Sequence, residues 1–590
     1  MRYDVGRFRR PMRRSTEGQL MSLISLGDGS TLTLDFTTGV LDPRLTFSRT
    51  SDATFINSSG LVQWADANHV QNSTMLNNTG TRWTQVTSGG TVTINGDGTV
   101  RFNGTGGRAT WLQSISSLAS GLPMTFSFRV TSFTNTNLRT TDLFNAGTGF
   151  TGQSYFYTDT TGTTHTLTAF ESLPKSGTNG VGTYSVTATT NATSANIIFG
   201  SDCNGVGSRS GDVTITEPQL QYGTVVPRRV YVPNSSIIAA KWDSARFDHD
   251  PTTRAPRGLL IEGTATNIAT NSNLQAAWLG GSNTTVTANT NEVTSPDGTN
   301  NAAKIALTNT GYCSRFESIT GLANATTYTF SYWIRGTAGN QQRVYSVTQG
   351  TDLVTQSNLT YTSTGWTRVQ ITFTSGAVNN NVYIYVASRP SGTVNDVLYV
   401  YGCQLEAGNG ASSLIPTGAS TGQRLADSCV MTGTNFSSWF AGATEGVLYA
   451  ELERPRSQSG NPLHDFAAVG TRYSSGSAFV LYVGNTNYYP TVLLWPTGGA
   501  LFPGGIASVI PLVSKQAGKW FGGNDATNFA NGVQGTTSAG SGTLTPAMLS
   551  IGANSATGTE ATRDWLNACV RRVKFWPVAL PDSQIIALTT

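Results

Sequence analysis

The sequence predicts an all-β protein made of tandem β-sandwich modules of the jelly-roll type, followed by a further sandwich at the C-terminal end. Three observations predict this class. Charged residues make up only 12% of the 590 residues whereas glycine alone contributes 65. Short runs alternate between apolar and polar residues with period two. One block of sequence also recurs later in the chain. An aromatic share of 10% argues against disorder.

The recurring block defines two modules. Asn72-Ser-Thr-Met75 returns as Asn271-Ser-Asn-Leu274, and Gln219-Leu-Gln-Tyr-Gly223 returns as Gln404-Leu-Glu-Ala-Gly408. Two copies of one module in one chain are typical of a binding protein. The two modules are expected to span residues 71–232 and 269–417.

Strands are expected where the alternation is clean. No amphipathic segment long enough for a helix separates them, which favours two packed sheets over a parallel α/β sheet. Between the Thr-Phe-Ser and Gln-Leu motifs that both modules share, the first module is longer than the second. We therefore expect an inserted surface loop near Tyr155, Tyr157 and His165. The single helix that we expect covers residues 582–588, capped by Asp582 or Ser583. The clearest strands of the second module are residues 328–334, 366–373, 382–386 and 396–401.

Residues 1–29 are expected to form a basic N-terminal arm. The first 20 residues contain six arginines and two carboxylates, and this excess of four positive charges accounts for the whole net charge of +4. Such an arm either docks on an acidic protein surface or stays a solvated tail. We do not expect it to bind nucleic acid. The arginines assigned to docking are Arg7, Arg9, Arg10, Arg13 and Arg14.

Export and crosslinking signals are weak. The apolar stretch at residues 20–26 is too short for a signal sequence, and nothing approaches the ~18 apolar residues of a membrane span. We therefore expect assembly in a cytoplasm and no membrane insertion. The cysteines are odd in number and never form a C-x-x-C pair, so we expect buried small side chains, with a Cys313–Cys403 disulfide as the alternative. The five are Cys203, Cys313, Cys403, Cys429 and Cys569.

Two groups of motifs lie on either side of the first module. They are Leu32-Thr-Leu-Asp-Phe36 and Asp42-Pro-Arg-Leu-Thr-Phe-Ser-Arg49, then Ala245-Arg-Phe-Asp-His-Asp-Pro251 and Arg257-Gly-Leu-Leu-Ile-Glu-Gly263. Together they resemble a framework found in tail-fibre and other surface-fibre proteins of bacteriophages. In that family the two halves lie close in sequence, whereas here the first module separates them. The framework segment is thus residues 30–70 plus 233–268. The resemblance implies a virion fibre or adhesin, a homotrimer, and an arm that docks on other virion proteins.

Further resemblances concern the modules themselves. The second module, with Ser363-Thr-Gly-Trp-Thr367, is similar to the carbohydrate-binding-like jelly rolls of phage fibres. Residues 423–590 resemble a laminin-G or concanavalin-like lectin domain through residues 432–440, Glu445-Gly-Val447 and residues 566–575. Many members of that fold bind sugars and some hold calcium. The resemblance therefore implies no obligatory cofactor and leaves Ca²⁺ open in the C-terminal domain.

Glycan binding is the chemistry that the composition favours. Sugar sites pair an aromatic platform with amide, carboxylate or guanidinium groups that fix the hydroxyls. For each candidate aromatic residue the alternative is packing in a core. The candidates are Trp278, Tyr312 and Arg315 in the second module, Tyr155 and Tyr157 in the first, and Tyr488, Tyr489, Trp520, Asn524 and Asp525 in the last.

Catalytic patterns are poorly supported. Glu451 and Glu453 share one face of a strand, but the acidic residue that related glucanases place between them is missing. Gly418-Ala-Ser-Thr-Gly422 matches a nucleophile elbow in letters only, because no strand precedes it. Asp248 and Asp250 suggest a turn rather than a metal site. We therefore predict a virion-located, non-enzymatic binder of bacterial surface polysaccharide, with a polysaccharide depolymerase and a purely structural virion part as the alternatives.

Overall fold

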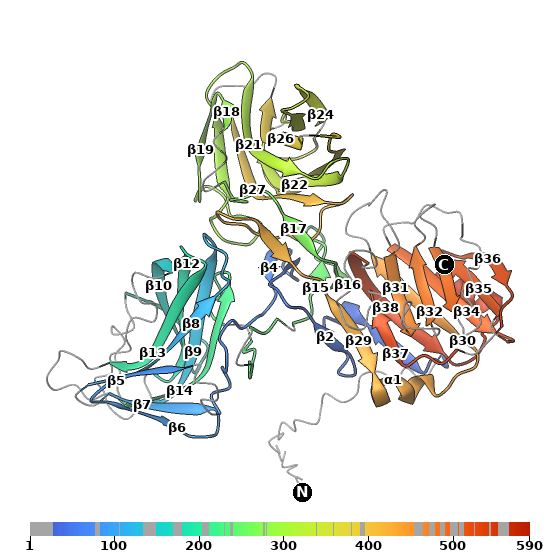
Figure 1. Ribbon diagram of the computed structural model, residues 1–590, viewed down its shortest axis with the longest axis horizontal. Coiled ribbons are helices and arrows are strands. Elements are labelled where there is room, and N and C mark those ends of the chain that lie inside the picture. The colour runs from blue at the N-terminus through green and yellow to red at the C-terminus, as the bar shows by residue number, and fades with distance from the viewer. Residues whose placement is uncertain are drawn as a thin grey trace, which may run out of the picture.

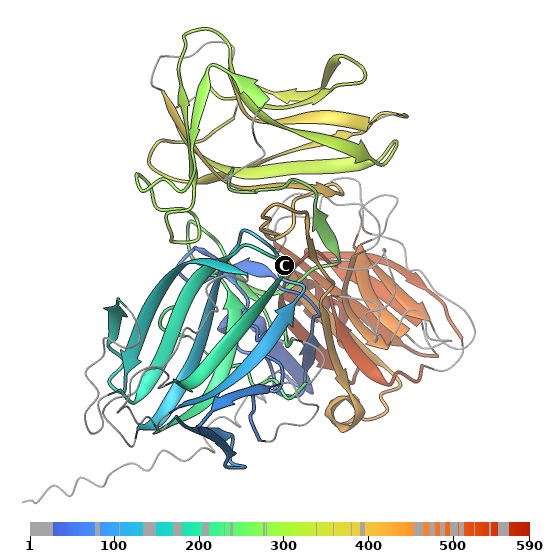
Figure 2. The ribbon, with the colours of Figure 1, turned by 60° about the vertical axis from the view of Figure 1, so that its left-hand side comes forward.

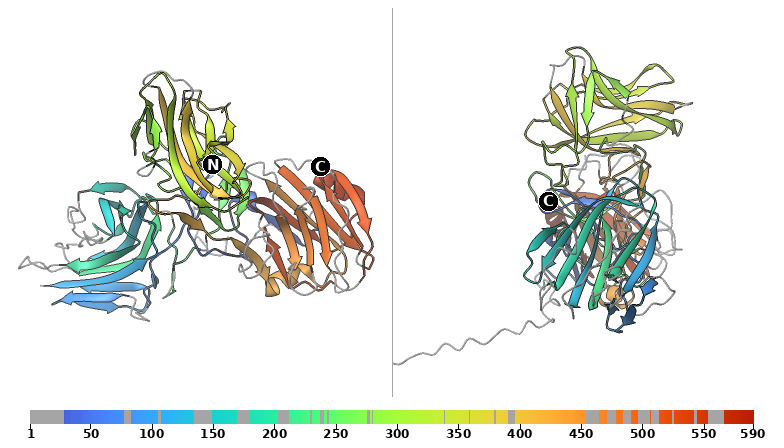
Figure 3. Two further views of the ribbon diagram at one scale, coloured as in Figure 1. Left: turned by 45° about the horizontal axis from the view of Figure 1, so that its top comes forward. Right: turned by 90° about the vertical axis from the view of Figure 1, so that its left-hand side faces the viewer.

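The protein is an all-β molecule in which three sandwiches surround a central junction (Figure 1). The first module, the second module and the C-terminal sandwich form separate lobes, as Figure 2 and Figure 3 also show. Within the described residues, no helix is long and apolar enough to cross a membrane. The computed structural model describes residues 28–76, 83–104, 107–133, 149–168, 180–202, 212–228, 230–236, 240–242, 244–274, 278, 280–337, 339–357, 359–378, 380–389, 396–453, 464–470, 478–483, 490–495, 506, 513–523, 525–541, 544–552 and 566–590.

The C-terminal sandwich includes strands from the expected framework segment. Its first sheet has the order β15-β16-β38-β30-β34-β35-β36, with β1 also paired to β38, and its second has the order β2-β29-β37-β31-β32-β33. Strands β1 and β2 of framework residues 30–70, and β15 and β16 of residues 233–268, thus belong to the sheets of residues 423–590. The strands are β1 (Leu32–Asp35), β2 (Thr46–Ser48), β15 (Phe247–His249), β16 (Pro256–Ile261), β29 (Ser428–Thr432), β30 (Gly446–Glu453), β31 (His464–Gly470), β32 (Ala478–Val483), β33 (Pro490–Trp495), β34 (Val513–Phe521), β35 (Asp525–Ala530), β36 (Val533–Ser538), β37 (Met548–Ile551) and β38 (Ala568–Trp576).

The first module packs a sheet of order β11-β10-β12-β9-β14-β7-β6 against a sheet of order β13-β8-β5. Aromatic side chains fill the space between them, with Trp83 and Trp111 stacked at 5.5 Å between ring centroids. Its strands are β5 (Thr84–Ser88), β6 (Thr91–Ile94), β7 (Thr99–Asn103), β8 (Arg108–Ser116), β9 (Pro123–Phe133), β10 (Phe150–Asp159), β11 (Thr164–Leu167), β12 (Gly182–Thr190), β13 (Ser194–Asp202) and β14 (Asp212–Tyr222).

The second module packs a sheet of order β18-β21-β26-β23-β24 against a sheet of order β19-β20-β27-β22-β25. The four strands expected from alternation are confirmed as β22, β25, β26 and β27. The strands are β18 (Gly280–Ser282), β19 (Thr284–Thr287), β20 (Ala303–Leu307), β21 (Cys313–Leu322), β22 (Thr327–Gly336), β23 (Gln342–Ser346), β24 (Thr351–Gln356), β25 (Thr367–Thr374), β26 (Asn380–Arg389) and β27 (Val397–Ala407).

The internal repeat is visible in the backbone. Asn72 and Asn271 both adopt positive φ angles, 49° and 48°, and so do Met75 and Leu274, at 53° and 55°. A buried asparagine lies just before each of these turns and bonds four backbone groups, two through its amide nitrogen and two through its oxygen. The two asparagines are Asn68 in the first module and Asn267 in the second.

The surface loop expected near Tyr155, Tyr157 and His165 is wrong in form, because these residues lie in a hairpin, β10–β11, at the edge of a sheet. The hairpin follows β9 in the chain just as β23–β24 follows β22. It joins the sheet of β9, however, whereas β23–β24 joins the sheet opposite β22. The two modules therefore share most strands and differ in where one hairpin is attached.

Two short strand pairs, one a local hairpin and one between segments distant in sequence, lie near the junction. β3 (Thr54–Ile56) pairs with β4 (Val62–Trp64), and β17 (Ala265–Asn267) pairs with β28 (Gly422–Arg424). The described cysteines Cys313, Cys403, Cys429 and Cys569 are free and buried, as expected, and Cys203 lies outside the described residues.

The helix expected at residues 582–588 is confirmed as α2 (Asp582–Thr589), although Pro581 rather than a polar side chain precedes it. The sequence analysis missed α1 (Gly433–Phe440). Its composition is poor for a helix. Phe436, Trp439 and Phe440 recur at helical spacing and all enter the core of the C-terminal sandwich, so packing rather than propensity stabilises it. A short 3₁₀ turn, η1 (Phe36–Thr38), follows β1.

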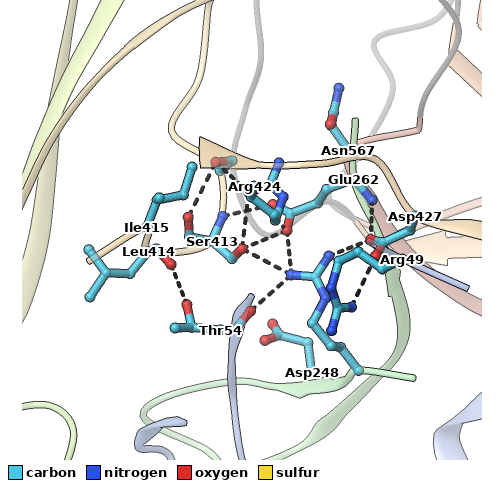
Figure 4. A network of polar contacts seen from close by, with 12 residues as sticks. Arg49, Thr54, Asp248, Glu262, Ser413, Leu414, Ile415, Arg424, Asp427 and Asn567 are labelled. Atoms are coloured by element: carbon cyan, nitrogen blue, oxygen red, sulfur yellow. Dashed lines mark hydrogen bonds and ion pairs between the residues drawn. The ribbon is translucent and has the colours of Figure 1, made fainter. Parts of the chain in front are cut away.

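A buried ion network joins the framework to the C-terminal sandwich (Figure 4). The side chain of Arg246, at 0% exposure, pairs with Glu262 at 2.6 Å and with Asp427. Arg49 approaches the other oxygen of Asp427 at 3.2 Å, and Arg424 lies 3.4 Å from Glu262. Burial alone would raise the pKa of Glu262, but Arg424 and Arg246 outweigh it and hold that pKa at about 2. The Glu262 carboxylate therefore stays charged and paired at neutral pH.

Candidate functional site

One outer face of the second module carries a row of aromatic side chains. On β26, Val382, Ile384 and Val386 point into the core. Tyr383 and Tyr385 alternate with them and therefore lie on the opposite face of the sheet. Their neighbours on this face, by strand register, are Phe316 on β21 and Arg343 and Tyr345 on β23. We call Tyr312, Phe316, Arg343, Tyr345, Tyr383 and Tyr385 the aromatic face.

The rings of this face are in mutual contact. The centroid of Phe316 lies 4.4 Å from that of Tyr383 and 4.9 Å from that of Tyr385. Tyr345 stacks on Tyr383 at 6.0 Å with an interplanar angle of 14°. Gly280, paired with Phe316 across the strands, leaves the space that this ring occupies, because a Cβ there would lie 2.3 Å from the ring. Contacts of this kind fix the rings before any ligand arrives.

Arg343 supplies the charge at this face. Its guanidinium lies over the rings of Tyr345 and Tyr385, at 5.3 and 4.9 Å from their centroids. It pairs with Asp352 at 2.6 Å and donates to the hydroxyl of Tyr312 at 2.9 Å. Burial would lower the pKa of Arg343, but the bond to Asp352 more than compensates and raises it. Burial also raises the pKa of Tyr385 to about 12, so the phenol stays neutral at neutral pH.

The arrangement suits a ligand with apolar faces and hydroxyl groups. The half-buried rings of Phe316, Tyr345 and Tyr383 present flat carbon surfaces, with the buried ring of Tyr385 beneath the guanidinium of Arg343. The guanidinium, the carboxylate of Asp352 and the tyrosine hydroxyls supply donors and acceptors around them. Tyr312 is 40% exposed and lies at the margin of the face. Asp352 is the carboxylate among the described residues beside this face, and it is bound to Arg343. These described residues therefore include no pair of carboxylates for acid–base catalysis.

The first module has no such face at the equivalent sheet. β8 and β13 pair as β21 and β26 do, with Ile198 opposite Leu112 and Asn196 opposite Ser114. These positions alternate with the core residues Trp111 and Ile197, so they face outward. The hairpin that contributes Arg343 and Tyr345 in the second module joins the other sheet here. The described part of the first module therefore lacks both the rings and the arginine.

Among the residues predicted from sequence, Tyr312 joins the aromatic face and Arg315 does not. Arg315 Nη2 donates to the backbone oxygen of Thr284 at 2.8 Å, and Nη1 donates to that of Trp278 at 3.3 Å. The Arg315 side chain thus holds neighbouring backbone in place. Trp278 is only 2% exposed and stacks near Phe330 in the core, with its indole N–H donating to Thr270.

Other predicted platforms are also buried. Trp520 lies in the core of the C-terminal sandwich, and its indole N–H donates to the Thr444 oxygen at 3.1 Å. Tyr157 is buried, with its hydroxyl donating to Val181 at 2.8 Å. The prediction that Trp278, Trp520 and Tyr157 are exposed platforms is wrong, because each fills a core position.

The remaining predicted residues have mixed outcomes. Tyr155 is half-buried on the hairpin β10–β11, where its hydroxyl donates to Gln153 at 2.5 Å. Asp525 is half-buried and accepts from the backbone of Gly540 at 3.0 Å. The other predicted residues lie outside the described part of the chain, namely Tyr488, Tyr489, Asn524, Arg7, Arg9, Arg10, Arg13 and Arg14.

The carboxylate pair considered for catalysis is neutralised by arginines. Arg571 contacts both Glu451 and Glu453, Arg572 contacts Glu451 at 3.0 Å, and Arg257 contacts Glu453 at 3.1 Å. Asp250 accepts from the backbone of the turn that follows it. Within the described ranges, no group of three His, Cys, Asp or Glu side chains is placed to hold a metal ion. Calcium in the C-terminal domain stays a prediction.

The sequence held a signal for the residues that were missed. Tyr383 and Tyr385 are spaced by two within a strand whose intervening residues are aliphatic. That pattern places two tyrosines side by side on the outer face. Phe316, Arg343, Tyr345 and Asp352 come from strands whose pairing no local pattern reveals.

One family model and several solved structures are similar to parts of this chain. Residues 265–393 match the family described as a carbohydrate binding domain. No curated protein matches the chain. Weak similarity extends to a Ruminococcus gnavus IT-sialidase CBM40 bound to alpha2,3 sialyllactose (20% identity, TM-score 0.22, 26% of this chain and 86% of that one). It also extends to the CBM22-1–CBM22-2 tandem of Paenibacillus barcinonensis Xyn10C (10% identity, TM-score 0.18, 58% of this chain and 98% of that one). The region matched by the family contains the whole aromatic face.

Proposed function

We propose that this chain binds polysaccharide without cleaving it, and that the aromatic face of the second module is the binding site. The observation that carries the proposal is the contact cluster of Phe316, Tyr345 and Tyr383 beside the Arg343–Asp352 pair. Sugar rings stack their C–H faces on such aromatic surfaces while charged groups orient their hydroxyls. The family match over residues 265–393 supports the same chemistry.

We further propose that the protein is a bacteriophage fibre or adhesin that attaches the virion to bacterial surface polysaccharide. The support is the set of framework motifs, whose residues Arg49, Arg246 and Glu262 meet in one buried network. Arg7 to Arg14 would dock the arm on other virion proteins. A trimer would suit this role, because weak sites of roughly millimolar affinity gain on the order of 10² to 10⁴ when several engage one surface.

The test is co-sedimentation of the full-length protein with purified envelope polysaccharide of a host, with new reducing ends measured in the same tube. The variant Tyr345→Ala/Tyr383→Ala removes two rings of the aromatic face. Each ring contributes ~0.5–1.5 kcal/mol beyond its buried area, so we expect affinity to fall about 5- to 150-fold. The matched control is Tyr399→Ala, since Tyr399 is a half-buried tyrosine on the opposite sheet of the same module.

The outcomes separate the three functions. Binding that the double variant loses, that Tyr399→Ala keeps, and that yields no new reducing ends supports the proposal. New reducing ends would instead make the protein a depolymerase. If no envelope polysaccharide binds, the protein is a structural part of the virion. Binding that survives in the double variant would place the site elsewhere.

A further inference from the structure

A cleft lies between the framework, one end of the first module and the linker after the second module. Its volume is about 480 Å³, within the ~300–1,000 Å³ usual for small-molecule sites. Residues 50–53 and 64–71 form one wall, residues 115–122 another, and residues 414–423 a third. This cleft is separate from the aromatic face and outside the second module's sheets.

One wall of the cleft is aromatic. The ring of His69 meets Tyr222 edge-on at 5.3 Å and Trp242 edge-on at 5.9 Å. Trp64 stacks on Tyr222 at 5.0 Å with an interplanar angle of 26°. Tyr222 accepts from the backbone N–H of Ala119 at 2.6 Å, and burial raises its pKa, so its phenol is neutral. The wall thus combines flat carbon surfaces with fixed polar atoms.

The wall is held by the backbone and is rigid. Asn68 and Lys241 exchange backbone hydrogen bonds of 2.9 and 3.0 Å, which sets His69 and Trp242 side by side. Asn68 itself is clamped by its four backbone bonds. On the linker side, Gly418 approaches the first module so closely that a Cβ would lie 1.5 Å from the oxygen of Ser120. Such preorganisation lowers the entropy that a ligand must overcome.

The charges around the cleft favour an uncharged ligand. Asp52 Oδ1 lies 3.1 Å from His69 Nε2, so this carboxylate already has a partner. No arginine or lysine is among the described residues that line the cleft. The indole N–H of Trp242 is buried and has no hydrogen-bond partner in the described part of the chain, which leaves a donor beside the cleft. The other polar groups are hydroxyls and amides, from Thr50, Ser51, Gln71, Ser116, Ser117, Ser420, Thr421 and Gln423.

A neighbouring cleft of about 630 Å³ adjoins the first. Trp64, Leu122 and Pro416 line both. The second cleft is rich in asparagine from the second module, with Asn273 and Asn300 among its lining residues. Carboxamides bond hydroxyl groups both as donors and as acceptors. A ligand longer than one sugar ring therefore has polar partners on both sides of Trp64.

We propose that the cleft at Asp52, His69, Trp64 and Trp242 is a second binding site, and that its ligand is a short neutral saccharide. The aromatic wall receives the apolar face of a sugar ring, and the hydroxyls and amides of the rim bond its hydroxyls. Asp52 Oδ2, the carboxylate oxygen that is not bonded to His69 Nε2, and the Trp242 N–H fix its orientation. The site does not depend on the aromatic face, and either can exist without the other.

The experiment uses the full-length protein with the aromatic face silenced by Tyr345→Ala/Tyr383→Ala. The probes are cellobiose, maltose, lactose and N,N′-diacetylchitobiose, each at a concentration on the order of millimolar to suit a weak site. Binding is measured by saturation-transfer difference NMR. Ser420→Trp then fills the rim of the cleft from an exposed position, so the core is untouched. The matched control is Ser438→Trp, at an exposed position of α1.

At least one disaccharide is expected to give a signal in the silenced background. That signal should fall at least about fivefold, equal to ~1 kcal/mol, in Ser420→Trp and stay unchanged in Ser438→Trp. Trp242→Phe keeps a ring and removes the N–H, and it should weaken the signal as well. The proposal is overturned if no disaccharide binds the silenced protein, if binding survives Ser420→Trp, or if tetramethylammonium displaces the sugar, which would indicate a cation cage. If the silenced protein loses polysaccharide binding but keeps disaccharide binding, the two sites are distinct.

Discussion

Glu317 makes the stability of the second module depend on pH. Its side chain is 6% exposed, and Oε1 accepts from the backbone N–H and the hydroxyl of Thr270, at 3.2 and 2.8 Å. Oε2 is buried and has no hydrogen-bond partner in the described residues. Burial outweighs the Thr270 bonds and raises the pKa of Glu317 from 4.5 to about 7. The folded module therefore holds this proton more tightly than the unfolded chain does.

The sign of the effect follows from that order. Below the unfolded pKa the carboxyl is protonated in both states, and the stability of the module is fully present. As pH rises towards the folded pKa, the unfolded state loses its proton first, so stability falls. With pKa values of 4.5 and about 7, the loss between about pH 5 and about pH 8 is about 2.5 kcal/mol.

The perturbation is Glu317→Gln, which removes the titration and keeps the shape. Hydrogen exchange of peptides from β21 and β22, corrected for intrinsic rates, measures the opening free energy of the module at the two pH values. The wild-type value should drop by about 2.5 kcal/mol, and the variant's drop should vanish. The control is Glu292→Gln, an exposed residue whose bond to Lys304 lowers its pKa, so it should keep the wild-type pH dependence. Equal pH dependence in wild type and Glu317→Gln would refute the reasoning.

Two further predictions concern the junction. Arg246→Ala removes one buried arginine partner from both Glu262 and Asp427, so calorimetry of the full chain should show a loss of about 3–5 kcal/mol in the C-terminal sandwich. Arg129→Ala, at an exposed position, should cost less than about 0.5 kcal/mol, and a similar cost for both would contradict the buried network. Gly418→Ala places a methyl group 1.5 Å from the Ser120 oxygen, so amides at residues 120–122 and 271–272 should exchange faster. Gly365→Ala, with 3.6 Å to its nearest atom, should leave them unchanged, and equal protection in both variants would contradict the tight contact.

The repeat was the part of the fold most open to prediction from sequence. Asn72 and Asn271 adopt the same left-handed turn because the same local problem, a reversal before the first strand, has the same solution twice. Strands with clean alternation were found for a similar reason, since the pattern is local. α1 escaped because its stability comes from three aromatic side chains that pack against strands far away in sequence.

The candidate site was less open to prediction. Neither Trp278 nor Tyr312 lies in a clean alternating run of the sequence, yet one fills a core and the other lies at a surface margin. Burial depends on which sheet covers each residue, and a local pattern does not contain that information. Arg343 reaches Tyr312 only because β23 pairs with β26 and β26 pairs with β21. A site that is assembled from three strands appears only once their order is known.

The pairing of β1 with β38 determines when the C-terminal sandwich can close during translation. Leu32 lies opposite Phe575, so this part of the third sandwich cannot close until almost the whole chain has been translated. At ~5–20 residues per second, the wait is roughly half a minute to two minutes. Each jelly roll contains its own partners and is free to fold meanwhile, as local contacts form fast. β1 therefore stays an unpaired edge throughout this wait, and β2 stays one until its partner β29 has been translated. A chaperone that binds such edges is most needed in that interval.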